Sequence, residues 1–483
     1  MAHSRLRISA LLAAGLASAC SSTPDAVDLG ELYDQSAQGI GDDRIPVVVI
    51  PGILGSKLSN PETGQKIWGS FTYGAADADY ADGAREIALP MGLGVPLSEL
   101  EDGARVDGAL DYLVADIGPF RNIKIGAYVE IMLTLAVGQY RDQGLGESGA
   151  VDYGGQHYTC YQYPYDWRRD ISESAAGLHA KIEEAQARVR EARGLADDYP
   201  VRVDVVAHSM GGLVLRYYLR YGAEPLPEDG SVPEPTWAGA EHVERAFLIG
   251  TPSGGSVSSL RQLIEGLNLN PVFPNYRPSI LGTMPAVYQL LPRVRHGLVR
   301  DRETGEAIDF MDVATWEQYG WGLANPDEDD LLQWLLPEVE SAEERRRVAL
   351  DHLAKCLAKT DQLYRALDAP ASPPENTEIY LFAGDGVPTA SVLSVSDDGK
   401  VRIAEYAPGD DTVTRDSALM DERVGRAWTP GLDTPVAWDR IQFINASHIG
   451  LTQSTAFADN LLFMLLEQPR ITANPARAAA LSN

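Results

Sequence analysis

The sequence predicts an α/β fold with a mostly parallel sheet and helices on both of its faces. Short apolar segments of strand length alternate along the chain with longer amphipathic segments. Parallel sheets that are covered by helices on both faces consist of such near-continuous apolar strands. The chain has 483 residues, of which 45% are hydrophobic and 23% charged, so it is long enough for one large α/β domain with insertions.

The first twenty residues resemble a lipoprotein-type signal peptide. Arg5 and Arg7 precede the apolar segment ISALLAAGLASA, which is too short to span a bilayer and leads through small residues to Cys20. We therefore expect removal of the segment before Cys20, a lipid anchor on Cys20, and export to a bacterial cell envelope; a plain secretory signal is the alternative. Residues 21–43 are polar, acidic and without period, and are expected to form a flexible tether.

The composition excludes several functions. The net charge of −29 gives a surface that repels nucleic-acid phosphates and anionic lipid headgroups, so no nucleic-acid partner is expected. Beyond Cys20 the chain has only Cys160 and Cys356, which by themselves do not indicate a disulfide. Without clustered histidines they do not indicate a metal site either. No metal or cofactor is expected, and no later segment looks transmembrane.

The predicted α/β domain spans residues 44–467, and it begins with a buried strand. Ile45 to Ile50 form a continuous β-branched run that Pro51-Gly52 ends. The later segments that continue the alternation are a helix at 125–140, a strand at 158–167, a helix at 171–192, strands at 201–207, 243–252, 377–386 and 400–411, and a last helix at 455–468.

Two insertions and a tail interrupt or follow this alternation. A glycine- and aspartate-rich excursion at about 60–120 shows no period and is expected to be lid-like. The mixed helical and loop sequence at about 253–375 is expected to form a large cap. Residues 468–483 form an alanine-rich tail without pattern.

The segment VDVVAHSMGGLVLRYYL places a lone serine, Ser209, between a predicted strand and a predicted helix. A small residue two positions before the serine and glycine two positions after it, here Ala207 and Gly211, are typical of the nucleophile elbow of α/β-hydrolases. Bulky residues at these positions would collide in the sharp turn. Ser209 is therefore the predicted nucleophile, and the adjacent His208 is interpreted as structural.

A nucleophilic serine needs a base and an acid, which follow it in this fold in the order serine, acid, histidine. His448 is the one histidine beyond every candidate acid, and it lies in the small polar segment NASHIGLTQS before the last helix. Three aspartates follow predicted strands at suitable places: Asp385 in LFAGDGVPT, and Asp410 and Asp411 in YAPGDDTVT. The residue pattern does not choose between them.

The oxyanion hole requires two backbone N–H donors. In this fold one belongs to the residue after the nucleophile, Met210, and the other to the loop after an early strand. The loop PGILG makes Ile53 the candidate for the second donor.

Six blocks in order, IPVVVIPGILGSKL, YPYDWRRD, VDVVAHSMGGLVLRYYL, LIGTPSGGS, YAPGDDTVT and ASHIGLTQS, resemble the lecithin:cholesterol acyltransferase family of α/β-hydrolases, which includes phospholipases and bacterial members. The resemblance implies Asp410 as the acid and Ile53 and Met210 as the oxyanion donors. It implies that Asp166, Trp167 and Arg168 support the site from beneath.

The resemblance also places Trp68 near the lid, where the residue could meet an acyl chain or a membrane. One departure is that no cysteine lies between Ile53 and Cys160, where mammalian members hold a lid with a cysteine pair. The expected function is a serine O-acyltransferase or lipase/phospholipase that acts on lipid esters through an acyl-enzyme. The alternatives are an esterase for smaller esters or a peptidase on the same scaffold, and a non-catalytic surface lipoprotein.

Overall fold

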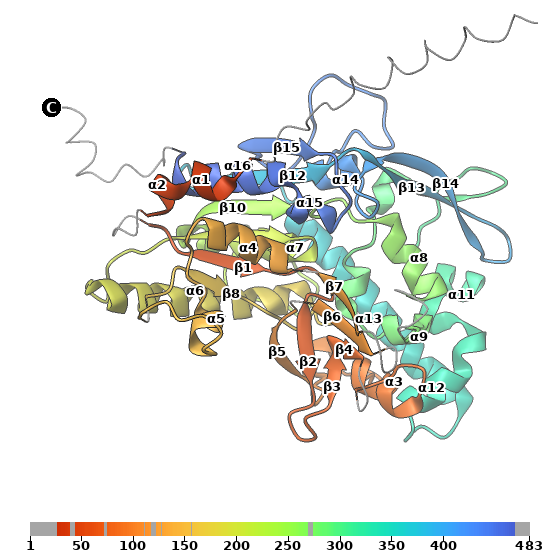
Figure 1. The fold of residues 1–483 in the computed structure, drawn as a ribbon. Helices are drawn as coiled ribbons and strands as arrows, with labels where there is room; N and C mark the ends of the chain where they lie inside the picture. Colours follow the sequence, from red (N-terminus) through yellow and green to blue (C-terminus); the bar gives the residue numbers. More distant parts are fainter. Residues whose placement is uncertain are drawn as a thin grey trace, which may run out of the picture.

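The structure is a computed structural model that describes residues 27–38, 44–71, 75–110, 112–116, 122–126, 128–155, 157–268 and 274–468. These residues form a central sheet of six parallel strands in the order β15-β12-β10-β9-β1-β8 (Figure 1). The strands are β1 (Val47–Ile50), β8 (Cys160–Gln162), β9 (Val203–His208), β10 (Val243–Ile249), β12 (Glu378–Gly384) and β15 (Arg440–Ile444).

Helices cover both faces of this sheet because its strands are apolar on both sides. In β1, Val48 and Ile50 belong to one core with α6 (Ile171–Arg193) and α7 (Met210–Tyr221). Val47 and Val49 belong to a second core with α4 (Val129–Val137) and α16 (Thr455–Leu466). The predicted α/β class with a mostly parallel sheet is thus confirmed.

The predicted strands and helices of the sheet region are confirmed in kind, with two differences. The segment expected as a strand at 400–411 is β14 (Val401–Gly409), but it pairs antiparallel with β13 (Val387–Val395) in a separate small sheet that β11 (Val299–Asp301) completes. The edge strand β15 was not predicted, because its sequence RIQFI alternates polar and apolar residues and only Ile444 is buried.

The excursion at about 60–120 contains regular structure despite its lack of period. β2 pairs antiparallel with β3 and β5, while β6 pairs with β4 and β7. Its elements and those up to β8 are β2 (Ser56–Ser59), β3 (Lys66–Trp68), β4 (Ser70–Phe71), α3 (Ala81–Ile87), β5 (Arg105–Ala109), β6 (Tyr112–Asp116), β7 (Asn122–Gly126) and α5 (Gln143–Glu147).

The expected cap at about 253–375 consists mainly of helices, and its buried side chains join the α6/α7 core, so it packs directly on the sheet domain. The cap helices are α8 (Val257–Glu265), α9 (Pro278–Leu281), α10 (Pro285–Tyr288), α11 (Val313–Tyr319), α12 (Asp329–Leu335) and α13 (Ala342–Asp368). Two further short helices, α14 (Arg415–Leu419) and α15 (Gly450–Gln453), belong to the chain after the cap.

Residues 27–38, which we expected within a flexible tether, instead form two short helices, α1 (Leu29–Leu32) and α2 (Asp34–Ala37). The buried Tyr33 hydroxyl donates to the Asp459 carboxylate at 2.7 Å, which fastens this segment to α16. The predicted signal peptide with Cys20 lies outside the described residues, as does the tail after Gln468. Within the described ranges, no helix combines the length and apolarity needed to cross a membrane.

Candidate active site

Ser209 occupies a sharp turn between β9 and α7. Its backbone has φ 54° and ψ −126°, a strained conformation for a residue with a Cβ atom. The turn is tightly packed: a Cβ atom on Gly211 would lie 2.5 Å from the Pro51 carbonyl oxygen. Glycine at position 211, where the sequence predicted a small residue on steric grounds, is therefore required by the contact between α7 and the loop after β1.

The structure brings Ser209, His448 and Asp410 together. The His448 Nε2 atom lies 2.9 Å from the Ser209 hydroxyl, and its Nδ1 atom lies 2.8 Å from Asp410 Oδ2. His448 sits in the loop between β15 and α15, and Asp410 follows β14 directly. This arrangement allows the imidazole to accept the serine proton while the carboxylate fixes the ring and stabilises its charged form.

The structure also chooses among the three candidate acids. Asp410 is 1% exposed, and its Oδ1 atom accepts backbone N–H groups of Thr412 at 3.1 Å and Val413 at 2.7 Å. Its other oxygen is thus left for His448. Asp411 lies in the same turn with φ 76°, and its carboxylate is exposed. Asp385 lies between β12 and β13 and does not contact the imidazole.

His208, interpreted as structural from the sequence, packs directly against His448. Its ring centroid lies 4.9 Å from that of His448, and its Nε2 atom lies 3.3 Å from the His448 carbonyl oxygen. Burial and the neighbouring His448 lower the pKa of His208 to about 3. The ring is therefore neutral at ordinary pH and can donate Nε2–H to this carbonyl.

The loop after β1 approaches the nucleophile closely. A Cβ atom on Gly52 would lie 2.8 Å from Ser209 Cβ, so only glycine allows this approach. Ile53, the next residue, lines the cavity above the serine, and Met210 begins α7. Among the described residues, neither the Ile53 nor the Met210 N–H has a hydrogen-bond partner, so both are available as oxyanion donors.

Trp68 lies on β3 within the lid-like excursion, as the resemblance implied, but its side chain is buried. The residue is 1% exposed and does not belong to the described residues that line the cavity, so it meets neither an acyl chain nor a membrane. Its Nε1–H instead donates to the Leu54 carbonyl at 2.8 Å, and its ring packs edge-on against Trp167. Trp68 therefore supports the oxyanion loop from below.

The expected support by the block YPYDWRRD is visible in its contacts. The fully buried Arg168 forms ion pairs with Asp166 at 2.7 Å and Asp102 at 2.6 Å. The Trp167 Nε1–H donates to the Ser56 carbonyl at 3.2 Å, and the ring lines the cavity. Trp167 thus holds β2, and Arg168 joins Asp166 to Asp102.

A cavity of about 440 Å³ opens over Ser209 and His448. Its wall is largely apolar, as in sites that bury hydrocarbon chains. The leucine, isoleucine and valine residues that line it are Ile53, Leu54, Leu110, Leu267, Leu281, Val287, Leu290, Val413 and Ile449. The polar lining residues outside the triad include Ser256, Ser258, Ser259 and Gln262 from the start of α8, and Asp411 and Thr412 from the acid loop.

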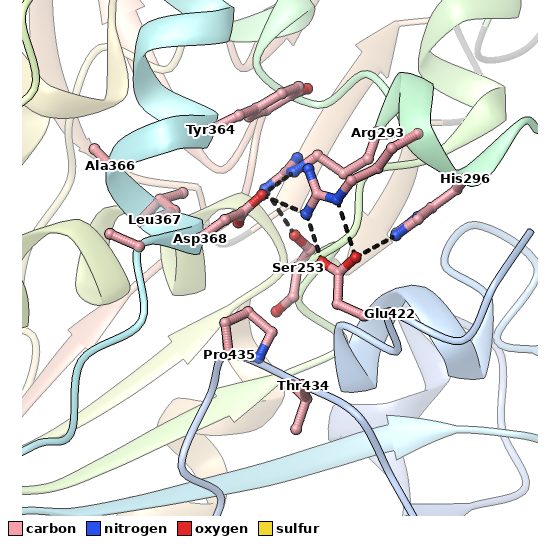
Figure 2. Close-up of polar contacts among 12 residues, drawn as sticks. Ser253, Arg293, His296, Tyr364, Ala366, Leu367, Asp368, Glu422, Thr434 and Pro435 are labelled. Atoms are coloured by element: carbon pink, nitrogen blue, oxygen red, sulfur yellow. Dashed lines mark hydrogen bonds and ion pairs between the residues drawn. The ribbon is translucent and has the colours of Figure 1, made fainter. Parts of the chain in front are cut away.

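A buried ion-pair network fixes the loop that precedes α8 (Figure 2). Arg293 stacks on the ring of Tyr364, pairs with Asp368 at 2.8 Å, and donates to the Ser253 carbonyl at 3.1 Å. Arg295 joins the same Asp368 to Glu422, beyond α14. Burial opposes ionisation of Asp368, but Arg293, Arg216 and Arg295 together outweigh it and lower the pKa of this carboxyl to about 2.

The helix that starts at the nucleophile is also held at its far end. The Arg216 guanidinium on α7 donates to the Leu367 carbonyl at 3.0 Å, and Arg220 donates to the Ala369 carbonyl at 2.6 Å. Cations at a helix C-terminus stabilise the last carbonyl groups, so α7 and α13 are joined here. Burial lowers the pKa of Arg216 to about 9.

Sequence reasoning missed the ion-pair network around Arg293 and the polar face of α8. The arginines and serines concerned lie in the cap, where the chain shows no clear alternation, and their partners are distant in sequence. The described residues contain no cluster of three or more side chains suited to hold a metal ion. Cys160 and Cys356 are both buried and unpaired, so they form no disulfide with each other.

Comparison with known proteins finds one family whose sequences resemble part of this chain. The sequence profile of the lecithin:cholesterol acyltransferase family matches residues 151–329, which include the elbow and the start of the cap. The chain is an α/β-hydrolase similar to this family. A chain in the crystal structure of the Tle4-Tli4 complex has the same fold, with a TM-score of 0.56 and 15% identity over 88% of this chain and 98% of that one.

Two other solved structures match more weakly. Lipase BlEst2 from Bacillus licheniformis, in its propeptide form, has a TM-score of 0.29 and 13% identity over 65% of this chain and 44% of that one. Lipase 1 from Pelosinus fermentans has a TM-score of 0.29 and 15% identity over 68% of this chain and 91% of that one. No curated protein matches the chain. The family match and the fold support an activity among the lipid ester hydrolases and acyltransferases.

Proposed function

We propose that the protein is a serine-dependent lipase, phospholipase or O-acyltransferase that works through an acyl-enzyme. The observation that carries this proposal is the continuous chain of contacts from Ser209 through His448 to Asp410, at 2.9 and 2.8 Å, beneath a largely apolar cavity. A purely structural serine would not need a strained backbone, an oriented imidazole and a cavity beside its hydroxyl.

In this mechanism Ser209 attacks the ester carbonyl and its proton passes to His448 Nε2. The Ile53 and Met210 N–H groups hold the oxyanion, and each such donor contributes about 3 kcal/mol of transition-state stabilisation. The ester C–O bond then breaks, and His448 returns the proton to the leaving alcohol. Water or a second alcohol, deprotonated by His448, attacks the acyl-enzyme and releases fatty acid or a new ester.

The test uses the full chain with a phospholipid and an acylglycerol, each with and without an added long-chain or sterol alcohol. Free fatty acid and new ester are both quantified. Ester formation would identify a transferase, whereas fatty acid alone would identify a hydrolase. Ser209→Ala should lower the rate by about 10⁴-fold or more. A Ser209→Ala protein that stays active would remove Ser209 from the mechanism.

A smaller-ester esterase is the alternative that the cavity size permits. If the protein cleaves short-chain esters and its activity does not rise with acyl-chain length, this result would favour an esterase for smaller esters over a lipase. A protein that binds lipid but cleaves no ester would favour the non-catalytic lipoprotein.

We also propose that Cys20 carries a lipid anchor that keeps the enzyme near its substrate at a bacterial membrane. One acyl chain alone gives only marginal binding, so lasting attachment needs more than one chain. Metabolic labelling with a fatty acid, followed by mass spectrometry of the mature N-terminus, tests this anchor. Cys20→Ser should abolish the label, and labelled Cys20→Ser protein would contradict the proposal.

A further inference from the structure

One helix face gives the otherwise apolar cavity a polar side. Ser258, Ser259 and Gln262 on α8 all line the cavity, and their spacing of three and four residues places them on one face of the helix. These three side chains have no hydrogen-bond partner among the described residues. Polar groups that face a cavity without a protein partner are available to a ligand.

This polar side lies next to the general base. The Ser256 hydroxyl, which caps α8, donates to the Thr412 carbonyl at 2.7 Å and so fastens the helix to the acid loop. That loop positions His448 through Asp410. Because His448 must deliver its proton to the leaving alcohol, the alcohol part of an ester lies on this side of Ser209.

Asp411 adds a carboxylate to the same side. Its backbone is held in the left-handed region at φ 76°, and its N–H donates to the Thr389 hydroxyl at 2.8 Å, so the residue is fixed. Among the described lining residues, Asp411 is the only aspartate, glutamate, lysine or arginine. A carboxylate accepts hydrogen bonds from hydroxyl groups and repels phosphate.

We propose that the alcohol part of the substrate is uncharged and rich in hydroxyl groups, as in acylglycerols and sugar esters. The inference rests on the proposed ester chemistry at Ser209. Gln262 and the two serines hydrogen-bond to the free hydroxyls, Asp411 accepts from a further hydroxyl and disfavours anionic phospholipid headgroups, and the apolar wall takes the acyl chain.

The first test compares two esters with the same acyl chain, a monodecanoyl glycerol and ethyl decanoate, on the full chain. The readout is the ratio of kcat/KM for the glycerol ester to that for the ethyl ester. Gln262→Leu should lower this ratio at least tenfold, because the glycerol hydroxyls lose their partner while the cavity keeps its volume. Ser259→Ala, a small change that the fold tolerates, should lower it at least threefold.

Arg261→Gln is the matched control, because Arg261 on α8 is exposed, is not among the described lining residues of the cavity, and pairs with Glu265. The control should leave the ratio unchanged. An unchanged ratio in both Gln262→Leu and Ser259→Ala would overturn the inference, even if every variant cleaves both esters. Failure of the wild-type protein to cleave any ester would instead overturn the proposed function, and this inference with it.

The second test addresses Asp411 with phosphatidylglycerol and phosphatidylcholine of identical chains in matched detergent micelles. The wild-type protein should cleave the anionic lipid more slowly. Asp411→Asn, which keeps the shape and removes the charge, should raise the rate on phosphatidylglycerol relative to phosphatidylcholine at least threefold. An unchanged preference in Asp411→Asn would show that this carboxylate does not select the headgroup.

Discussion

At the scale of single residues, the site depends on how two adjacent aspartates are used. Asp410 and Asp411 have the same chemistry, but the turn aims one carboxylate at His448 and leaves the other in the cavity wall. Two backbone N–H groups hold Asp410 Oδ1, so its orientation does not depend on flexible neighbours. The role of each carboxylate is therefore set by the backbone rather than by the residue type.

Replacement of Asp410 tests that assignment. Asp410→Asn keeps the shape of the side chain but presents an amide to His448 Nδ1, which favours the wrong tautomer of the imidazole. In a serine triad such a change lowers kcat by about 10⁴-fold. We expect a loss of that order on a soluble short-chain ester, with little change in KM. Asp385→Asn, at the acid that the sequence left open, is the control and should keep full activity; equal losses in both variants would contradict the assignment.

Ser209 and His448 were predictable because both are tied to chain order and to local patterns, whereas Asp410 was selected among three aspartates only by the family resemblance. Ser209 has its small neighbours, and His448 is the one histidine after all candidate acids. The burial of Trp68 was not predictable, because it depends on packing against Trp167, which is distant in sequence. The polar face of α8 could have been noticed as serines and a glutamine at helical spacing, but only the fold turns that face toward Ser209.

At the scale of secondary-structure elements, buried parallel strands were predictable and edge elements were not. β9 and β10 are buried along their whole length, so their sequences are mostly apolar, and Arg245 of β10 pairs with Asp204 of β9. β15 lies at the edge of the sheet and is mostly accessible, so its sequence lacks that signature. Likewise β14 carries an apolar pattern, but periodicity alone does not tell a strand of the main sheet from one in a separate hairpin.

The elements around the site are joined by Arg293, and its removal gives a prediction at this scale. Arg293→Met leaves the buried Asp368 carboxylate short of its main partner and frees the Ser253 carbonyl. Removal of one partner from a buried ion pair costs about 3–5 kcal/mol of unfolding free energy. We expect a loss in that range by urea denaturation.

The double variant Arg293→Met with Asp368→Leu is the control for this prediction. It removes both charges, so it should recover part of the lost stability. The single variant Asp368→Leu is measured as well. If the unfolding free energy lost by the double variant equals the sum of the losses in Arg293→Met and Asp368→Leu, the two residues do not act as a pair.

At the scale of the whole molecule, the protein combines a strongly acidic composition with buried basic and imidazole groups. The net charge of −29 is accompanied by Arg168, Arg245 and Arg293 in the interior, each paired with an aspartate. A buried histidine behaves differently, because it avoids the cost of burial by staying neutral. The stability of the fold should therefore respond to acid through its buried imidazoles as well as its carboxylates.

His352 on α13 is the residue at which this response can be isolated. Its Nε2 atom lies 3.0 Å from the Thr283 carbonyl, while its Nδ1 atom has no hydrogen-bond partner among the described residues. Burial lowers the pKa of His352 to about 4, with Lys355 acting in the same direction. Protonation would place a second N–H donor in the interior without an acceptor.

The unfolded chain binds a proton at His352 near pH 6.5, whereas the folded chain does so only near pH 4. Below pH 6.5 the unfolded state therefore holds more protons, and the unfolding free energy should fall until about pH 4, by about 3 kcal/mol in all from this residue. His352→Gln keeps a donor toward Thr283 and removes the titration. Urea denaturation at steps from pH 7 to pH 4.5 should show a shallower decline for the variant than for the wild-type protein, and parallel declines would show that His352 is not kept neutral by the fold.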